Sequence, residues 1–326
     1  MADRMLVEAV RMALARVMSE DETVILLGED IGRNGGVFRA TNGLLERFGE
    51  QRVRDTPIAE AAIAGLAVGL AAQGMRPVAE IQFSGFIYPC IDQLTNHASR
   101  LRTRTRGRLT CPLVIRSPSG GGIHAPEHHS ESMEALLTHV PGLRVVFPSS
   151  PKRAYGLLLS AIRGPDPVVF FEPTRLYRSA KEDVDDSGEG LPLNCCFTLR
   201  EGTDVTLVTW GATVIEALAA GDHAADEGVS VELIDVAILK PLDFETIRAS
   251  VSKTGRAVIV HEAPVSGGFG AEIAARIADE ALLSLLAPVK RVAGYDVVMP
   301  LPRLEQFYLP DEPRIMAAIR DVMSYT

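Results

Sequence analysis

The chain has 326 residues, of which 47% are hydrophobic and 23% are charged, and its formal net charge is −9. This composition is typical of a globular protein, and the acidic excess argues against broad binding to nucleic acids or anionic membranes. The apolar run Ala61–Ala72 is shorter than the roughly 20 residues that a membrane-spanning helix needs, so we expect no membrane partner.

The N-terminal sequence and the spacing of the cysteines indicate in which cellular compartment the protein is expected. Near the start of the chain, charged residues leave no room for the apolar part of a secretory signal: Asp3, Arg4, Glu8 and Arg11. The cysteines show neither zinc-site spacing nor a disulfide framework: Cys90, Cys111, Cys195 and Cys196. We therefore expect a reducing compartment, the bacterial cytoplasm, or the mitochondrial matrix if the chain is a processed eukaryotic one.

Short β-rich runs alternate with helical patterns in the first part of the chain. The predicted strands are Val24–Gly28, Pro77–Phe83, Pro112–Ser117, Leu143–Pro148 and Val168–Glu172. The predicted helices are Met5–Met18, Ala59–Gly74, Tyr88–Leu101 and Lys152–Arg163. Because runs such as 168–171 are apolar throughout, these strands are expected to be buried on both faces of a parallel sheet.

An acidic segment containing Gly188, Gly190 and Pro192 then interrupts the pattern and indicates a linker. Strands are predicted again at Val205–Thr209, Val229–Asp235, Ala257–His261 and Val289–Ala293. Helices are predicted at Ala212–Glu227, Phe244–Ser252 and Gly268–Leu286. The pattern predicts an α/β protein of two domains with mainly parallel sheets, residues 1–178 and 198–326, joined by a linker at 179–197.

One carboxylate stands at the start of an otherwise apolar helix. Thr56 is expected to cap this helix and Pro57 to occupy its first position, and eight of the twelve residues after Glu60 are Ala or Gly. Apolar surroundings raise the pKa of a carboxyl group, so Glu60 is a candidate for proton chemistry. The alternative is that Glu60 only complements the helix dipole.

Several motif matches fail on their context. His124–His128 fits H-x-x-E-H, but zinc binding by this motif needs a continuous helix, and the glycines 120–122 with Pro126 favour a loop. Segments 149–152 and 253–255 match two penicillin-recognising elements without the third, S-D-N. Segment 267–270 lacks the last glycine of a dinucleotide loop.

The loop Gly120–Ser132 remains the most polar candidate for a binding site. It contains the adjacent histidines His128 and His129 after a glycine-rich bend, and it follows a buried strand. Ligands of α/β domains bind at such loops. The composition alone leaves a structural and a functional role for these histidines equally open.

The order and spacing of several motifs carry a family resemblance along nearly the whole chain. The motifs are Gly28–Asp30, Gly35–Arg39, Asp55–Glu60, Glu80–Phe83, Ile115–Pro118, His129–Ser130, Pro141–Gly142, Phe171–Pro173, Val205–Gly211, Lys240–Asp243 and His261–Pro264. In these residues the chain resembles the beta subunit of the thiamine-diphosphate-dependent decarboxylating component of 2-oxoacid dehydrogenase complexes. The resemblance implies a transketolase-like fold, with a pyrimidine-binding domain and a transketolase C-terminal domain.

The resemblance also implies roles for individual residues. Glu60 matches the glutamate that hydrogen-bonds N1′ of the cofactor's aminopyrimidine, and His129 matches a histidine implicated in acyl transfer to the lipoyl group. Phe86 falls where an aromatic ring contacts the pyrimidine, and Ile58 and Gln82 line the same pocket by position. A structural potassium ion would be held by main-chain carbonyls of Leu113, Ala161, Ile162, Gly164 and Asp166. His124 and His128 receive no role.

A missing motif implies a partner. Thiamine enzymes hold the diphosphate through magnesium with a G-D-G motif followed by Asn residues, and this sequence has no G-D-G; Gly221–His223 is the nearest match and lies in a helical pattern. The resemblance therefore implies an alpha subunit that holds the magnesium, in an alpha2beta2 heterotetramer. It also implies a lipoyl-bearing acyltransferase that docks on the C-terminal domain, with Asp321 and the carboxylate of Thr326 as candidate contacts.

The substrate class is a small 2-oxoacid. The stretches His261–Phe269, Gly294–Asp296 and Glu305–Tyr308 resemble branched-chain enzymes, which favours a branched-chain 2-oxoacid. Pyruvate dehydrogenase and acetoin dehydrogenase beta subunits are the alternatives within the family. The alternative of another class is a binding subunit without a catalytic role.

Overall fold

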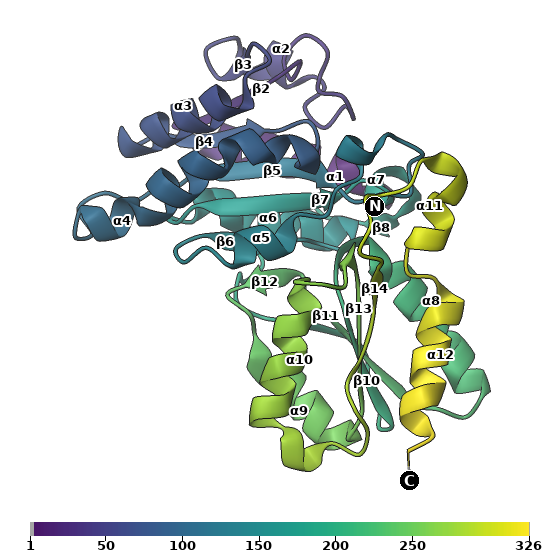
Figure 1. Cartoon of the computed structure of the whole chain (residues 1–326). Helices are drawn as coiled ribbons and strands as arrows, with labels where there is room; N and C mark the ends of the chain where they lie inside the picture. The colour runs from purple at the N-terminus through teal and green to yellow at the C-terminus, as the bar shows by residue number, and fades with distance from the viewer. Residues whose placement is uncertain (1–2, 326) are drawn as a thin grey trace.

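Two mainly parallel sheets organise the computed structural model, which describes residues 3–325 (Figure 1). The first sheet has seven strands in the order β12 (Ile238–Lys240), β6 (Arg144–Val146), β7 (Val168–Pro173), β5 (Val114–Ser119), β4 (Arg76–Glu80), β2 (Val24–Gly28) and β3 (Val53–Asp55). Only β12 pairs antiparallel with its neighbour. Strand β12 enters this sheet from the second half of the chain, so the two halves are interlocked.

The second sheet has five strands in the order β14 (Lys290–Gly294), β13 (Ala257–Pro264), β10 (Val205–Thr209), β11 (Val231–Asp235) and β9 (Phe197–Arg200), with β9 antiparallel. A small antiparallel pair, β1 (Asp3–Met5) with β8 (Lys181–Asp183), places part of the predicted linker against the N-terminal end of the chain. The prediction of two mainly parallel sheets is confirmed. The boundaries at 178 and 198 stay a prediction.

Helices cover both faces of each sheet. In the first half they are α1 (Leu6–Glu20), α2 (Leu44–Phe48), α3 (Glu60–Ala72), α4 (Leu101–Arg104), α5 (Glu134–Thr138), α6 (Pro151–Arg163) and α7 (Leu176–Ser179). In the second half they are α8 (Val214–Asp226), α9 (Phe244–Thr254), α10 (Phe269–Glu280), α11 (Pro302–Tyr308) and α12 (Glu312–Met323). Helices α9 and α10 lie on one side of the second sheet, and α8 and α12 lie on the other (Figure 1). Within residues 3–325, no helix combines the length and the apolarity needed to cross a membrane.

Alternate residues of the central strands enter two different cores. On β7, Val168 and Phe170 pack with α1 and α6, whereas Val169 and Phe171 pack on the opposite face. These side chains are buried, as expected for a parallel sheet covered on both faces. Helix α6 begins at Pro151, one residue before the predicted Lys152, because the Ser150 side chain accepts a hydrogen bond from the Arg153 amide and Pro151 occupies the first turn.

The predicted helix at 88–101 is wrong. The chain instead forms a 3₁₀ segment at Ser84–Cys90, a π turn at Gln93–His97 and another 3₁₀ turn at Ala98–Arg100 before α4. Pro89 lacks an amide proton for the helical ladder. The hydroxyls of Thr95 and Ser99 donate to the carbonyls four residues earlier, at 2.7 and 2.8 Å, and such bonds often bend helices.

The expected start of α3 also differs. The helix begins at Glu60 after Ala59, without a capping side chain in the described structure. Thr56 donates its amide to the Gly28 carbonyl instead, and its hydroxyl is buried without a hydrogen-bond partner among residues 3–325. The segment 56–59 is therefore a non-helical connection out of β3, which places Glu60, rather than Pro57, in the first helical turn.

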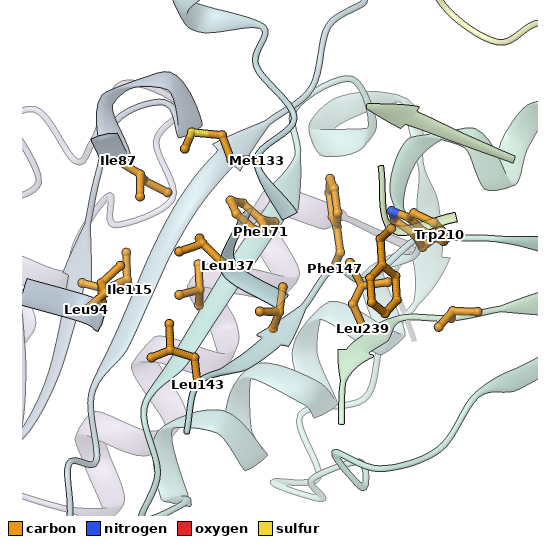
Figure 2. Packing of buried hydrophobic residues seen from close by; sticks show 14 of the residues in the cluster. Ile87, Leu94, Ile115, Met133, Leu137, Leu143, Phe147, Phe171, Trp210 and Leu239 are labelled. Atoms are coloured by element: carbon orange, nitrogen blue, oxygen red, sulfur yellow. The ribbon is translucent and has the colours of Figure 1, made fainter. Parts of the chain in front are cut away.

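The largest apolar core runs continuously from the first sheet to the second (Figure 2). Phe147 and Phe171 lie 5.5 Å apart between ring centroids, and Trp210 and Leu239, from the second half, belong to the same cluster. Because this core is shared, side chains of the C-terminal half can hold loops of the N-terminal half in fixed positions.

A buried carboxyl group in this core predicts a pH-dependent stability. Glu134 is buried and accepts a hydrogen bond from Trp210 Nε1 at 3.2 Å, and burial raises the pKa of Glu134 to about 7 from 4.5. The folded state thus binds this proton more tightly than the unfolded chain. The contribution to stability is complete below about pH 4.5 and is lost as the pH rises to about 7, on the order of 3 kcal/mol.

We expect Glu134→Gln to remove the loss of stability that ionisation of Glu134 causes as the pH rises. Glutamine keeps an acceptor for Trp210 but cannot ionise. The Tm of the variant relative to the unmodified protein should increase between pH 5 and pH 8, measured on both proteins in parallel. Identical pH dependence of the two Tm values would contradict the assignment to Glu134.

A buried ion cluster lies at the centre of the first sheet. Arg116 on β5 donates to both carboxylate oxygens of Glu172 on β7, each at 2.7 Å, and also to Glu80 on β4. Burial opposes the charge of Arg116, but Glu172 and Glu80 raise its pKa, so the guanidinium stays charged. Burial also raises the pKa of Glu80. The two hydrogen bonds from Arg116 to Glu172 form a bidentate pair.

Candidate active site

Glu60 lies beside a second carboxylate that the sequence did not single out. Glu29 follows β2 directly and is 6% exposed, whereas Glu60, in the first turn of α3, is half-buried. Burial, and then the negative charge of Glu60, raise the pKa of Glu29, while the Ala59 amide opposes the shift by donating to it. One Glu29 oxygen has no hydrogen-bond partner within the described residues. Glu29 is therefore suited to hold a proton beside the Glu60 carboxylate.

The topology explains why these groups meet. Glu29 follows β2, Ala59 and Glu60 follow β3, and Gln82 follows β4, so all three segments leave the carboxyl edge of the same parallel sheet. Gln82 Nε2 donates to the Glu29 carbonyl at 3.5 Å. The Cys90 thiol contacts the Glu60 carbonyl at 3.2 Å, and burial, followed by the charges of Glu60 and Glu29, raises the pKa of Cys90 to about 12. That thiol stays neutral.

An aromatic cluster adjoins this group through the chain neighbours Gln82 and Phe83. The His129 ring lies 4.3 Å from Phe83 and 5.2 Å from Phe86 between centroids, and Phe83 lies 5.7 Å from Phe86. His129 Nδ1 is buried and has no partner in the part of the chain that the structure describes. A side chain at position 85 would collide with the His128 carbonyl, so Gly85 permits this close approach.

The loop that bears His129 connects β5 to α5. It contains one 3₁₀ turn, Glu127–His129, and no continuous helix, as the sequence predicted for H-x-x-E-H. His124 pairs through Nδ1 with Glu305 at 3.0 Å and is otherwise exposed, while His128 is exposed. Across residues 3–325 no group of three or more His, Cys, Asp or Glu side chains is arranged to hold a metal ion.

The five residues expected to bind potassium lie elsewhere. Leu113 precedes β5, Asp166 precedes β7, and the others lie in the last turn of α6 or directly after it, so all five lie at the amino edge of the first sheet, opposite Glu60. Arg76 Nη1 donates to the carbonyls of Ile162 and Gly164 at 2.9 Å each. The Asp166 side chain pairs with Arg102 at 2.6 Å, and the Leu113 carbonyl accepts the Val168 amide.

The structure thus brings some predicted site residues together and leaves others apart. Glu60 and Gln82 belong to the carboxylate group, and Phe86 and His129 belong to the aromatic cluster next to it. Ile58 is 84% exposed and contributes no enclosed wall in this chain alone. Sequence reasoning missed Glu29, Phe83 and Cys90 as site residues; the motifs containing Glu29 and Phe83 were recognised without a role for either residue.

Comparison with known proteins gives concordant results. Residues 3–180 match the family model for the transketolase pyrimidine-binding domain, and residues 196–315 match that for the transketolase C-terminal domain. The chain is 47% identical over 325 residues, the full length of both chains, to a Bacillus subtilis protein named pyruvate dehydrogenase E1 component subunit beta. It is 48% identical over 315 residues to an Acholeplasma laidlawii protein of the same name, covering 97% of this chain and 96% of the relative.

A solved structure supports the fold independently. A split-gene transketolase, described as an inactive beta4 tetramer, superposes with a TM-score of 0.82 at 23% identity and covers 99% of each chain. At this identity the likeness shows the fold alone. Together with the relatives, it shows that the expected transketolase-like architecture is correct.

Proposed function

We propose, since the chain belongs to the transketolase-like family of 2-oxoacid dehydrogenase E1 beta subunits, that it provides the pyrimidine half of a thiamine diphosphate site. The observation that carries this proposal is the Glu29–Glu60 carboxylate pair next to the aromatic cluster of Phe83, Phe86 and His129. The unpartnered oxygen of Glu29 and the unpartnered Nδ1 of His129, counted over residues 3–325, are polar groups that a bound ligand can satisfy.

In the proposed reaction, the cofactor and the residues of this chain have different roles. Thiamine diphosphate, when bound, supplies the carbon nucleophile and the electron sink for decarboxylation. Glu60 exchanges a proton with the pyrimidine N1′, and its charge, after burial, raises the pKa of the neighbouring Glu29. Phe86 offers an apolar face to the pyrimidine. His129, with one nitrogen free, handles a proton during acyl transfer to the lipoyl group.

An alpha subunit completes the site. E1 beta subunits work with an alpha subunit, and we propose an alpha2beta2 heterotetramer in which the alpha chain holds the magnesium. The exposed face of α3 supports this proposal, because it presents Ala61, Ala62, Leu66 and Gly69. A helix that is apolar on all sides is normally covered. Burial of this face would also enclose Ile58 and Glu60, which the isolated chain leaves open.

The second partner is a lipoyl-bearing acyltransferase. Asp321, one of its two candidate contacts, pairs with Lys290 at 2.5 Å on the C-terminal half, and the other, Thr326, lies outside the described residues. The relatives named above are bacterial, so we propose a bacterial cytoplasmic protein.

Pyruvate is the substrate that the relatives favour. Both are named as pyruvate dehydrogenase subunits, which supports the pyruvate alternative over the branched-chain preference drawn from the sequence. The alpha chain from the same genome should be co-expressed, and the assembled enzyme assayed with pyruvate and with branched-chain 2-oxoacids. We expect faster turnover of pyruvate. Faster turnover of a branched-chain 2-oxoacid would refute the substrate assignment, and an assembled complex inactive on every 2-oxoacid would refute the function.

Potassium at the amino edge of the first sheet is a separate proposal. The donor set is chemically suitable, since hard cations prefer oxygen ligands. A carbonyl oxygen has two lone pairs, so the bonds from Arg76 leave a second one on Ile162 and Gly164 for an ion. We expect potassium chloride, compared with sodium chloride, to increase the free energy of unfolding by about 2.7 kcal/mol when potassium exceeds its Kd a hundredfold, and therefore to raise the Tm. Equal Tm values in the two salts would exclude a stabilising potassium ion.

A further inference from the structure

Carboxylates of the C-terminal half hold the main chain of the loop that bears His129. Glu305 on α11 accepts the Gly122 amide at 2.6 Å through one oxygen and the His124 amide at 3.1 Å through the other. Glu262 on β13 accepts the Gly121 amide. These three amides belong to the N-terminal half. In sequence, Gly122 and His124 lie 183 and 181 residues from Glu305, and Gly121 lies 141 residues from Glu262.

The loop is built to fit closely against these carboxylates. A side chain at position 122 would collide with Arg175, and one at position 121 would require the terminal methyl of Met299 to move. His124 adopts a left-handed conformation, with φ of 58°, which is unfavourable for a non-glycine residue. The contacts with Glu305 include both the amide and the Nδ1 of His124, so they act on the strained residue itself.

Burial and nearby charges stabilise the hydrogen bonds between Glu305 and the loop. Glu305 is 2% exposed, so its two hydrogen bonds are shielded from water. Arg175, next to Gly122, is paired with Glu216 on α8, and its pKa, which burial alone would lower, is raised by Glu216 and further by Glu262 and Glu305. A buried carboxylate that accepts two amides and lies near a guanidinium has no comparable set of partners in an unfolded or displaced loop.

We propose that Glu305 is a positioning residue that fixes the segment 122–124 and thereby places His129 against Phe83 and Phe86. The inference rests on the proposed function for the role of His129, but the clamp itself is a property of this chain. Glu305 bonds to residues 122 and 124 and makes no hydrogen bond to His129, Glu29 or Glu60 within residues 3–325. It therefore acts through the main chain.

Glu305→Gln tests the clamp with almost no change in volume. Glutamine has one acceptor oxygen and one amino group, so one of the two loop amides faces a donor. In the assembled enzyme we expect hydrogen–deuterium exchange at Gly122 and His124 to become about 10-fold faster or more. We also expect kcat for acylation of a lipoyl domain to fall about 10-fold, while the KM for thiamine diphosphate changes less than about twofold. Glu312→Gln on α12, whose carboxylate pairs with His223 instead, is the matched control.

Glu305→Asp is a second test of the proposal in case Glu305→Gln does not fold. Glu305→Asp keeps the charge and both acceptors on a shorter side chain, and we expect partial protection of the same amides and an intermediate kcat. Unchanged exchange at 122 and 124 in either folded variant would overturn the proposal, whatever the activity. Lack of 2-oxoacid turnover in the unmodified complex would instead refute the proposed function, and the exchange result would still decide the clamp.

Discussion

Replacement of Glu60 by glutamine is expected to lower 2-oxoacid turnover of the assembled enzyme by about 10²- to 10⁴-fold, the usual contribution of a positioned acid–base group. Glutamine has nearly the same size and can still form a hydrogen bond, but it cannot take up and release the proton that we propose Glu60 to exchange with the pyrimidine. Turnover should be measured at saturating thiamine diphosphate, so that weaker cofactor binding does not imitate the loss.

Glu46→Gln is the matched control for this experiment. Glu46 lies on α2 and is exposed, and the variant undergoes the same chemical change. We therefore expect its turnover to stay within about twofold of that of the unmodified enzyme. If the Glu60 variant decarboxylates as fast as the unmodified enzyme, the chain is a binding subunit and the alpha chain performs the proton chemistry. The same experiment therefore separates the two classes of function that the sequence left open.

Replacement of Arg116 by methionine is expected to give the largest loss of stability, about 3–5 kcal/mol. The substitution leaves Glu80 and Glu172 in the sheet interior without their cation, and both are buried. The free energy of unfolding should be measured by urea titration of the assembled protein. If the two carboxyl groups take up protons in the variant, the loss should be larger at high pH than at low pH, because the unfolded chain ionises them freely.

Arg102→Met provides the comparison. Arg102 pairs with Asp166 at 2.6 Å, but both side chains are partly exposed, and pairs of this kind contribute about 0–1 kcal/mol. A loss for Arg116→Met no greater than that for Arg102→Met would show that the buried cluster is not required for the stability of the sheet.

Much of the fold was predictable because the sheets are buried on both faces. The strands at 24–28 and 205–209 agree residue for residue with β2 and β10, since both are rich in the apolar and β-branched residues that favour buried strands. The helix α12 was not predicted, although Asp311 caps it and Ile315, Met316, Ile319 and Val322 form its buried stripe. That signal was present in the sequence. The π turn at 93–97 was not predictable from apolar spacing, because side-chain hydroxyls and Pro89 decide it.

The candidate site was only partly predictable for a different reason. Glu60 was singled out from its apolar surroundings and His129 from its polar loop, and the family resemblance gave both their roles. The reasoning from apolar surroundings anticipated a buried Glu60, whereas the chain leaves it half-exposed. The missing cover belongs to another polypeptide in the proposed assembly. Glu29 was overlooked because a single acidic residue after a strand has no spacing pattern, and its role depends on the packing of β2 beside β3.

The most direct test of the account is a structure of the assembled alpha–beta enzyme with thiamine diphosphate bound. We predict that the pyrimidine N1′ lies within hydrogen-bond distance of the Glu60 carboxylate, with Phe86 against the ring and the diphosphate held by the alpha subunit. A structure in which the pyrimidine lies away from Glu60 would contradict the account.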